Sequence, residues 1–188
     1  MARWETGTRE RLQAAALERF AEHGFDRTTV AEIATTAGLT ERTFFRYFAD
    51  KREVLFDGQD HFEQAFLDGL DGAPTAEPMA LVRASLTGAA AFFPDERRPW
   101  ARTRQAVISS HPGLQERELL KLSGLAVTLT GALRDRGLDA VTSALAAEST
   151  MTVFRTTFAA WIEDGQTRSF TELQDAVLDR LHTLVAPA

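Results

Sequence analysis

Apolar residues recur every three or four positions along almost the whole chain, and runs of alternating β-branched residues are missing. That spacing places apolar side chains along one face of a helix and is typical of amphipathic α-helices. Glycine and proline divide the pattern into about nine segments. The sequence therefore predicts an all-α fold. The predicted helices cover approximately residues 8–23, 30–37, 41–48, 51–70, 77–93, 99–109, 114–136, 139–164 and 170–185.

The first three predicted helices are short and carry clear end signals. Gly24 follows the first helix, where a left-handed C-terminal cap is expected. Thr29 and Glu32 have the spacing of a capping box at the start of the second helix, and Thr40 precedes the third. These signals predict a compact three-helix group at the N-terminus.

Helix length and charge both divide the chain into a head and a body. We expect a head over residues 1–52 and a body over residues 53–188, which begins with a connecting helix at about 51–70. The net charge is −6, but residues 1–52 contain nine Lys and Arg against eight Asp and Glu. The negative charge therefore lies in the body, and the near-neutral head is the part suited to an anionic partner.

The second and third helices, joined by a tight turn at Gly38, have the arrangement of a helix-turn-helix. The outward side of the third helix carries hydroxyl and guanidinium groups, which suit base edges and phosphate oxygens in a DNA major groove. These residues are Thr40, Arg42, Thr43, Arg46 and Tyr47. The pattern predicts a DNA-binding head, although short capped helices with surface arginines also occur in other small helical domains.

Composition excludes several other classes of protein. The chain has 188 residues, of which 44% are hydrophobic and 26% charged, as in ordinary globular proteins. It contains no cysteine, which excludes thiol catalysis, disulfide scaffolds and zinc fingers. No apolar window is long enough to span a membrane, and the first residues lack the apolar run of a signal peptide. We therefore expect a cytoplasmic protein without a membrane partner.

Enzyme and metal signatures are weak. The sequence has no G-x-S-x-G, P-loop or dinucleotide-binding motif. Two groups resemble carboxylate–histidine metal ligands on a helix: Asp179 with His182, and Asp57 and Asp60 with His61. A metal site in a helical bundle needs such pairs on several facing helices. We expect no enzyme activity, no metal and no cofactor.

Residues 28–51, TTVAEIATTAGLTERTFFRYFADK, resemble the signature of the TetR family of transcriptional repressors. The preceding helix, with Ala15, Ala16 and Phe20 ahead of Gly24, also resembles the opening of that family. The resemblance is close over the first part of the chain and extends to the rest by architecture. It implies a homodimer, a helical ligand-binding body, and a DNA operator from which a small-molecule effector releases the protein.

The resemblance also implies roles for individual residues. Thr29 would cap the second helix and touch phosphate, the Tyr47 hydroxyl would bond to phosphate, and Lys51 would contact the DNA backbone. The chain departs from the family at Phe45, where a tyrosine whose hydroxyl reaches phosphate is more common. The predicted DNA-binding residues are Thr28, Thr29, Thr40, Arg42, Thr43, Phe45, Arg46, Tyr47 and Lys51.

The body carries many aromatic residues, which we expect to line an effector cavity or to form packed core. Residues 97–122 resemble the C-terminal domain of a mycofactocin-regulator-like subgroup, which indicates a hydrophobic, acyl-type effector. The predicted pocket residues are Phe92, Phe93, Trp100, Arg104, Val107, Phe154 and Phe158.

The last two predicted helices carry apolar stripes at helical spacing. Two such helices from each subunit would form a four-helix bundle. A two-fold dimer places two recognition helices about 34 Å apart and reads a near-palindromic operator. The predicted dimer residues are Met151, Trp161, Leu173, Val177, Leu181 and Leu184.

These patterns favour a ligand-responsive, sequence-specific DNA-binding repressor. Its expected partners are a double-stranded DNA operator, a small hydrophobic effector and a second copy of the chain. The alternative is a helical small-molecule carrier or enzyme that merely keeps the head. Salt-sensitive binding to DNA flanking its own gene distinguishes the two, because only the repressor requires it.

Overall fold

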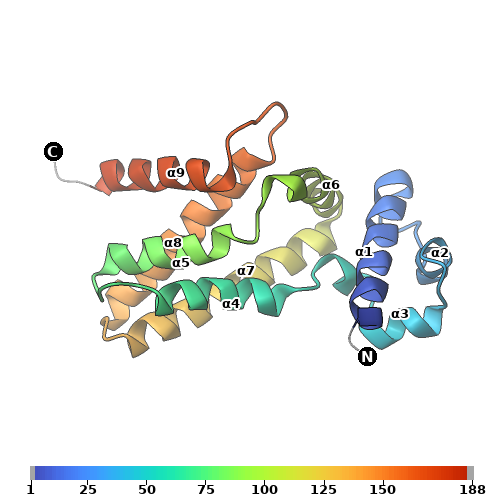
Figure 1. The fold of residues 1–188 in the computed structure, drawn as a ribbon, viewed down its shortest axis with the longest axis horizontal. Helices are drawn as coiled ribbons and strands as arrows, with labels where there is room; N and C mark the ends of the chain where they lie inside the picture. The colour runs from blue at the N-terminus through green and yellow to red at the C-terminus, as the bar shows by residue number, and fades with distance from the viewer. Residues whose placement is uncertain (1–2, 186–188) are drawn as a thin grey trace. The chain divides into compact units, whose positions relative to one another are not determined.

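The structure, a computed structural model, describes residues 3–185, with side chains from Gly7 to Leu184. Every regular element in that range is helical, which confirms the predicted all-α fold. The α-helices are α1 (Arg3–His23), α2 (Val30–Thr36), α3 (Glu41–Tyr47), α4 (Gln59–Asp71), α5 (Pro78–Ala90), α6 (Arg98–Ser109), α7 (Pro112–Asp135), α8 (Ala140–Trp161) and α9 (Phe170–Val185) (Figure 1). Two short 3-10 helices, η1 (Glu53–Leu55) and η2 (Asp95–Arg97), precede α4 and α6. No helix in the described range is long and apolar enough to cross a membrane.

The chain forms two compact units. The first comprises residues 1–57 together with 102–118, and the second comprises residues 58–101 together with 119–188. The predicted head lies wholly within the first unit. That unit also takes in the end of α6 and the start of α7, an association that the hydrophobic pattern did not indicate.

Helices α1, α2 and α3 pack in sequence order around a small core in the first unit. Ile33 of α2 and Phe44 of α3 are completely buried, and Phe20 of α1 is 2% exposed. The turn between α2 and α3 requires Gly38, whose φ of 66° lies in the left-handed region. The predicted helix-turn-helix is therefore present, and its core fixes how α3 is presented.

The predicted connecting helix at about 51–70 is interrupted. Gly58 (φ 80°) is left-handed, so it precedes α4 and does not lie inside a continuous helix. The Asp50 carboxylate accepts hydrogen bonds from the backbone N–H groups of Arg52 (2.7 Å) and Glu53 (3.1 Å) in the turn that leads into η1. Residues 54–56 are all buried. Because residues inside an α-helix have a φ of about −63°, the left-handed Gly58 separates them from α4.

Close contact between α4 and α5 organises the second unit, and the two helices lie side by side (Figure 1). The contact depends on two glycines. A Cβ at Gly69 would overlap the backbone carbonyl of Ala84, and a Cβ at Gly88 would overlap that of Ala65. Helix α5 also packs on α8 and α9, and α8 packs on α9. Only glycine at these two positions allows the backbones to approach so closely.

Aromatic rings fill one region of the core of the second unit, and they come from α4, the segment that follows α5, α8 and α9. Phe93 stacks on Phe170 with 4.4 Å between ring centroids and lies 5.7 Å from Phe154. Phe62 of α4 lies 5.2 Å from Phe154, and Phe158 lies 5.6 Å from Phe93. These five rings form what we call the aromatic cluster.

The α4–α5 contact gives a stability prediction. Gly88→Ala should lower the free energy of unfolding by roughly 1–3 kcal/mol, because the new Cβ meets rigid backbone and not a flexible side chain. Gly124→Ala in α7 is the matched control, since a Cβ there meets nothing within 4 Å and gains helix propensity of roughly 0.5–1 kcal/mol. Urea unfolding measures both. Equal effects of the two substitutions would contradict the close-contact assignment.

Candidate nucleic-acid interface

Helix α3 carries polar side chains on its outer face, and its start is fixed by a helix cap. Thr40 caps the helix, since its Oγ1 accepts a hydrogen bond from the Thr43 backbone N–H (3.2 Å) and lies 3.0 Å from the Thr43 hydroxyl. Arg42 is exposed and forms no hydrogen bond or ion pair with any described residue. The structure therefore leaves this guanidinium group available to an external anion or base.

At the end of α3, arginine side chains contact the rings of Tyr47 and Phe48. The Arg46 side chain donates a hydrogen bond to the Tyr47 hydroxyl (2.9 Å) and lies over its ring. Arg9 of α1 lies 5.7 Å from the ring centroids of both Tyr47 and Phe48, and it pairs with Asp57. Sequence reasoning missed this role of Arg9, because the contacts join residues that are far apart in the chain.

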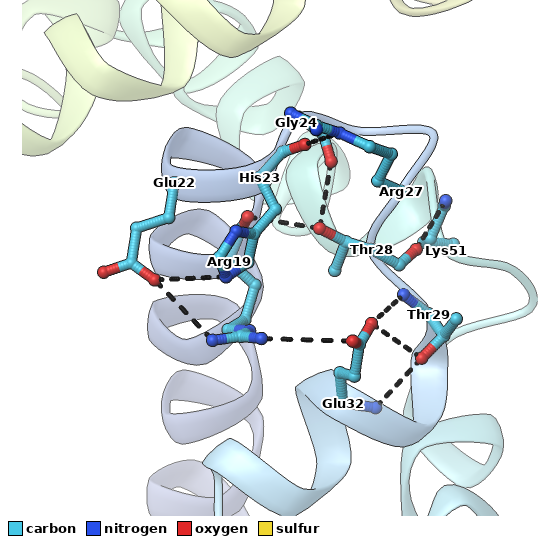
Figure 2. Close-up of polar contacts among 9 residues, drawn as sticks. All are labelled: Arg19, Glu22, His23, Gly24, Arg27, Thr28, Thr29, Glu32 and Lys51. Atoms are coloured by element: carbon cyan, nitrogen blue, oxygen red, sulfur yellow. Dashed lines mark hydrogen bonds and ion pairs between the residues drawn. The ribbon is translucent and has the colours of Figure 1, made fainter.

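Thr28, in the turn between α1 and α2, bonds to the end of α1, whereas the sequence predicted that it contacts DNA. Its side chain is 1% exposed, and its hydroxyl lies 2.9 Å from the carbonyl oxygen of Gly24 and 3.1 Å from that of Arg19 (Figure 2). The hydroxyl donates to these carbonyls at the end of α1, so we no longer expect this side chain to touch DNA. The sequence carries no burial signal here, because Thr28 lies in a loop without periodicity.

Lys51 also supports this turn from within the first unit. Its ammonium group donates hydrogen bonds to the carbonyl oxygens of Phe25 (2.6 Å) and Thr28 (2.8 Å), and it lies 4.2 Å from the centre of the Phe25 ring. Partial burial lowers the pKa of Lys51 below its usual value. An ammonium group has three N–H donors, so one remains for a DNA phosphate after these two bonds. Lys51 therefore has a structural role in the turn, and its contact with the DNA backbone stays a prediction.

The predicted capping box at the start of α2 is confirmed. The Glu32 backbone N–H donates to the Thr29 hydroxyl oxygen (3.2 Å), and the Thr29 backbone N–H donates to the Glu32 carboxylate (2.7 Å) (Figure 2). The backbone hydrogen bond from Thr29 is the main reason that the pKa of Glu32 is lowered, and the Thr29 hydroxyl and nearby Arg19 act in the same direction. Thr29 itself is exposed at the surface, where it remains a predicted DNA contact.

Part of the first unit comes from residues 102–118, which the sequence placed in the body. His111 packs against the Phe25 ring at 4.8 Å, and its Nε2 lies 3.1 Å from an Asp26 carboxylate oxygen. Arg117 pairs with Glu53 at 2.8 Å. These contacts hold the α1–α2 turn and η1 from a distant part of the chain.

Comparison with known families decides the identity of the chain. The family model described as "Bacterial regulatory proteins, tetR family" matches residues 12–57, and the model "MftR C-terminal domain" matches residues 76–186. The second match alone covers more than half of the chain. The chain belongs to the tetR family.

Two curated relatives match parts of this TetR-family chain. The HTH-type transcriptional regulator TcmR of Streptomyces glaucescens is 41% identical over 70 residues, which cover 37% of this chain and 31% of TcmR. The protein named as mycofactocin biosynthesis transcriptional regulator MftR in Mycobacterium tuberculosis is 32% identical over 127 residues, covering 66% of this chain and 63% of that protein. Each match therefore spans less than two thirds of the relative's length.

Solved structures of TetR-family regulators share the fold. FadR from Bacillus subtilis, in complex with stearoyl-CoA, has a TM-score of 0.65 at 21% identity, with 94% of this chain and 99% of that chain covered. PfmR from Thermus thermophilus has a TM-score of 0.57 at 21% identity, with 94% and 100% covered. At these identities the likeness shows the fold alone.

The predicted pocket residues of the TetR-family chain fall into both units. Phe93, Phe154 and Phe158 come together in the aromatic cluster. Phe92 and Trp100 also lie in the second unit, where both rings contact the Arg97 guanidinium group. Arg104 and Val107 belong to the first unit. There the Arg104 side chain donates to the Leu55 carbonyl (2.8 Å) and pairs with Glu118 (3.1 Å), and Val107 is buried.

The predicted dimer residues of α8 and α9 differ in accessibility. Met151, Trp161 and Leu173 are at most 5% exposed, because they pack in the core of the second unit. A second copy cannot reach these three side chains without repacking that core. Val177 and Leu181 are partly buried, and Leu184 is 82% exposed. These three residues of α9 remain the accessible part of the predicted face.

The capping box of the TetR-family head gives a pH prediction. Because the pKa of Glu32 is lower in the folded head than its usual value of 4.5, its carboxylate stabilises the fold above that value. This contribution is lost as the pH falls through the lowered pKa. Glu32→Gln should therefore reduce stability near neutral pH and flatten the decline below about 4.5.

Thermal unfolding of wild type and variant across pH measures this difference. Glu10→Gln, which removes an exposed carboxylate from α1, is the charge-matched control. The same flattening in both variants would show that overall charge, and not the capping box, is responsible.

Proposed function

We propose that this TetR-family regulator is a sequence-specific repressor that binds a palindromic DNA operator as a homodimer. The single observation that carries the proposal is the outer face of α3, where Arg42 has no partner among the described residues and the Thr40 and Thr43 hydroxyls lie on a capped, seven-residue helix. Guanidinium and hydroxyl groups are the donors and acceptors that read base edges and contact phosphates. The accessible α9 face at Val177, Leu181 and Leu184 supports the homodimer.

A gel-shift assay of the full chain with duplexes that flank its own gene tests this function. A repressor binds at least one such fragment with an affinity that falls steeply as salt rises, because binding releases counterions from DNA. A small-molecule carrier or enzyme that merely keeps the head binds none of them. Absence of salt-sensitive binding to any fragment would overturn the proposal.

Arg42 and Lys51 should affect DNA binding in different ways. Arg42→Ala should weaken binding by roughly 1–3 kcal/mol on the preferred operator and relax base preference at one position per half-site. Lys51→Ala should weaken binding to all duplexes alike and reduce the slope of affinity against salt by about one. It should also lower the unfolding temperature, since the carbonyls of Phe25 and Thr28 lose their donor.

Competition gel shifts with single-base operator variants, made well below each variant's unfolding temperature, measure both effects. The wild type on the same duplex series is the reference. If both substitutions relax base preference equally, the division into base contact and phosphate contact fails.

We further propose that a small hydrophobic effector binds the second unit and releases the operator. The aromatic cluster is apolar throughout, and three of its rings, Phe62, Phe93 and Phe158, are only partly buried, which supports an apolar ligand. The structurally similar FadR of Bacillus subtilis was solved with stearoyl-CoA, which supports an acyl-type molecule as the first candidate. A ligand that favours one conformation of a two-state regulator changes affinity at the other site by a coupling of typically 1–3 kcal/mol.

Stearoyl-CoA and stearate are the probes for this effector proposal. Either probe should raise the unfolding temperature of the free protein and weaken operator binding by roughly 5–150-fold. Coenzyme A alone is the control, because it lacks the acyl chain. If neither acyl probe shifts the unfolding temperature or the operator affinity, the acyl class is excluded.

A further inference from the structure

Phe45, one of the predicted DNA-binding residues of α3, is an exposed apolar side chain without the hydroxyl that would reach phosphate. Phe45 of α3 is 54% exposed. The other large hydrophobic side chains that are this exposed within the described residues are Leu119, Leu120, Val127, Val141, Leu145 and Leu184, and all of them belong to the second unit. In the first unit, the exposed large apolar group therefore lies on the helix that carries Arg42 and Arg46.

The Phe45 ring is held outward by the core of the head. Its centroid lies 5.5 Å from that of Phe44 in an edge-to-face arrangement (82°), and Phe44 is completely buried. An aromatic pair of this geometry restricts the position of the exposed ring. Arg42 lies three residues before Phe45, so both side chains occupy adjacent positions on the outer surface of α3.

The chemistry of a phenyl ring limits what Phe45 can recognise on DNA. It has no hydrogen-bonding group, so it cannot bond to a phosphate oxygen or to a polar base edge. In the major groove the apolar group presented by the bases is the C5-methyl of thymine. A phenyl ring held next to Arg42 on the outer surface of α3 is suited to that methyl group.

We propose that Phe45 determines specificity by packing against the methyl group of a thymine in each operator half-site. This inference rests on the proposed DNA-binding function and names a base-reading role within it. Phe45 acts by van der Waals contact and loss of apolar surface to water, while Arg42 and the α3 hydroxyls supply polar contacts. Specificity for an A·T pair at that position follows, because neither cytosine nor guanine carries the methyl group.

The test removes a single methyl group from the DNA and leaves the protein intact. Full-length wild-type protein selects duplexes from a random-sequence library, and each thymine of the selected operator is then replaced by uracil in turn. Uracil retains every hydrogen-bonding group of thymine. We expect one position per half-site at which uracil weakens binding by about three- to fivefold, the value for one buried methyl-sized group.

Two variants connect that position to Phe45. Phe45→Ala should bind the thymine and uracil operators with affinities that agree within about twofold, whereas Phe45→Tyr should keep the uracil penalty because it keeps the ring. Since Phe45 is exposed, both variants should fold, and thermal unfolding checks this. Leu39→Ala, a substitution of a half-buried residue in the turn before α3, is the control and should retain the penalty.

The outcomes separate this inference from the proposed function. If operator is selected but no uracil weakens wild-type binding, the thymine contact is overturned and DNA binding stands. The same holds if Phe45→Ala keeps the full penalty. If no duplex is selected at any salt concentration, the proposed function and this inference fail together.

Discussion

The short length of α2 and α3 is the constraint on which the rest of the head depends. Each helix has seven residues, and isolated helices of that length are not stable in water. They persist because Ile33 and Phe44 are completely buried in the core of the head and because the Thr29 and Thr40 hydroxyls accept hydrogen bonds from backbone N–H groups at the helix starts. Tertiary packing and capping thus fix the position of the outer face of α3, which carries the residues proposed to contact DNA.

Lysine and arginine side chains also stabilise the head, because they donate hydrogen bonds to backbone carbonyl groups at helix ends and in turns. Lys51 serves the turn before α2, and Arg11 of α1 donates to the carbonyl of Ala37 at the end of α2. Arg27 donates to the His23 carbonyl (2.7 Å) at the end of α1. Residues that look in the sequence like general DNA-binding charge therefore hold the scaffold together. Their loss would affect DNA binding through the positions of α2 and α3.

The features that could be predicted from the sequence depend on a few adjacent residues, whereas most features that were missed depend on contacts between distant parts of the chain. The capping box at Thr29 and Glu32, the cap at Thr40 and the glycines at 24 and 38 are properties of a few adjacent residues, and the structure has each of them as expected. The hydrophobic period likewise indicated nine helices, which the described residues contain. The late start of α4 was missed because glycine is compatible with both a helical and a left-handed backbone, and only the fold shows that Gly58 has the second (φ 80°).

Site residues were harder to predict because a stripe at helical spacing shows that a face is buried, but not what buries it. Met151, Trp161 and Leu173 form such stripes, and the core of the same protomer covers them. Thr28 shows the opposite case, since a threonine in a loop looks exposed although its hydroxyl is enclosed by the end of α1. In both cases the missing information is the identity of the neighbour, which only the folded chain supplies.

The distribution of charge in the head matters more for DNA binding than its total. Nine basic residues against eight acidic ones give residues 1–52 almost no net charge. Asp57 pairs with Arg9 and Asp50 pairs with Arg52, so these two cations are already paired inside the first unit. Arg42 has no such partner among the described residues, and it lies on the outer face of α3. A nearly neutral head can therefore still offer the exposed guanidinium groups of Arg42 and Arg46 on α3 to an anionic partner, because total charge does not determine which side chains are accessible.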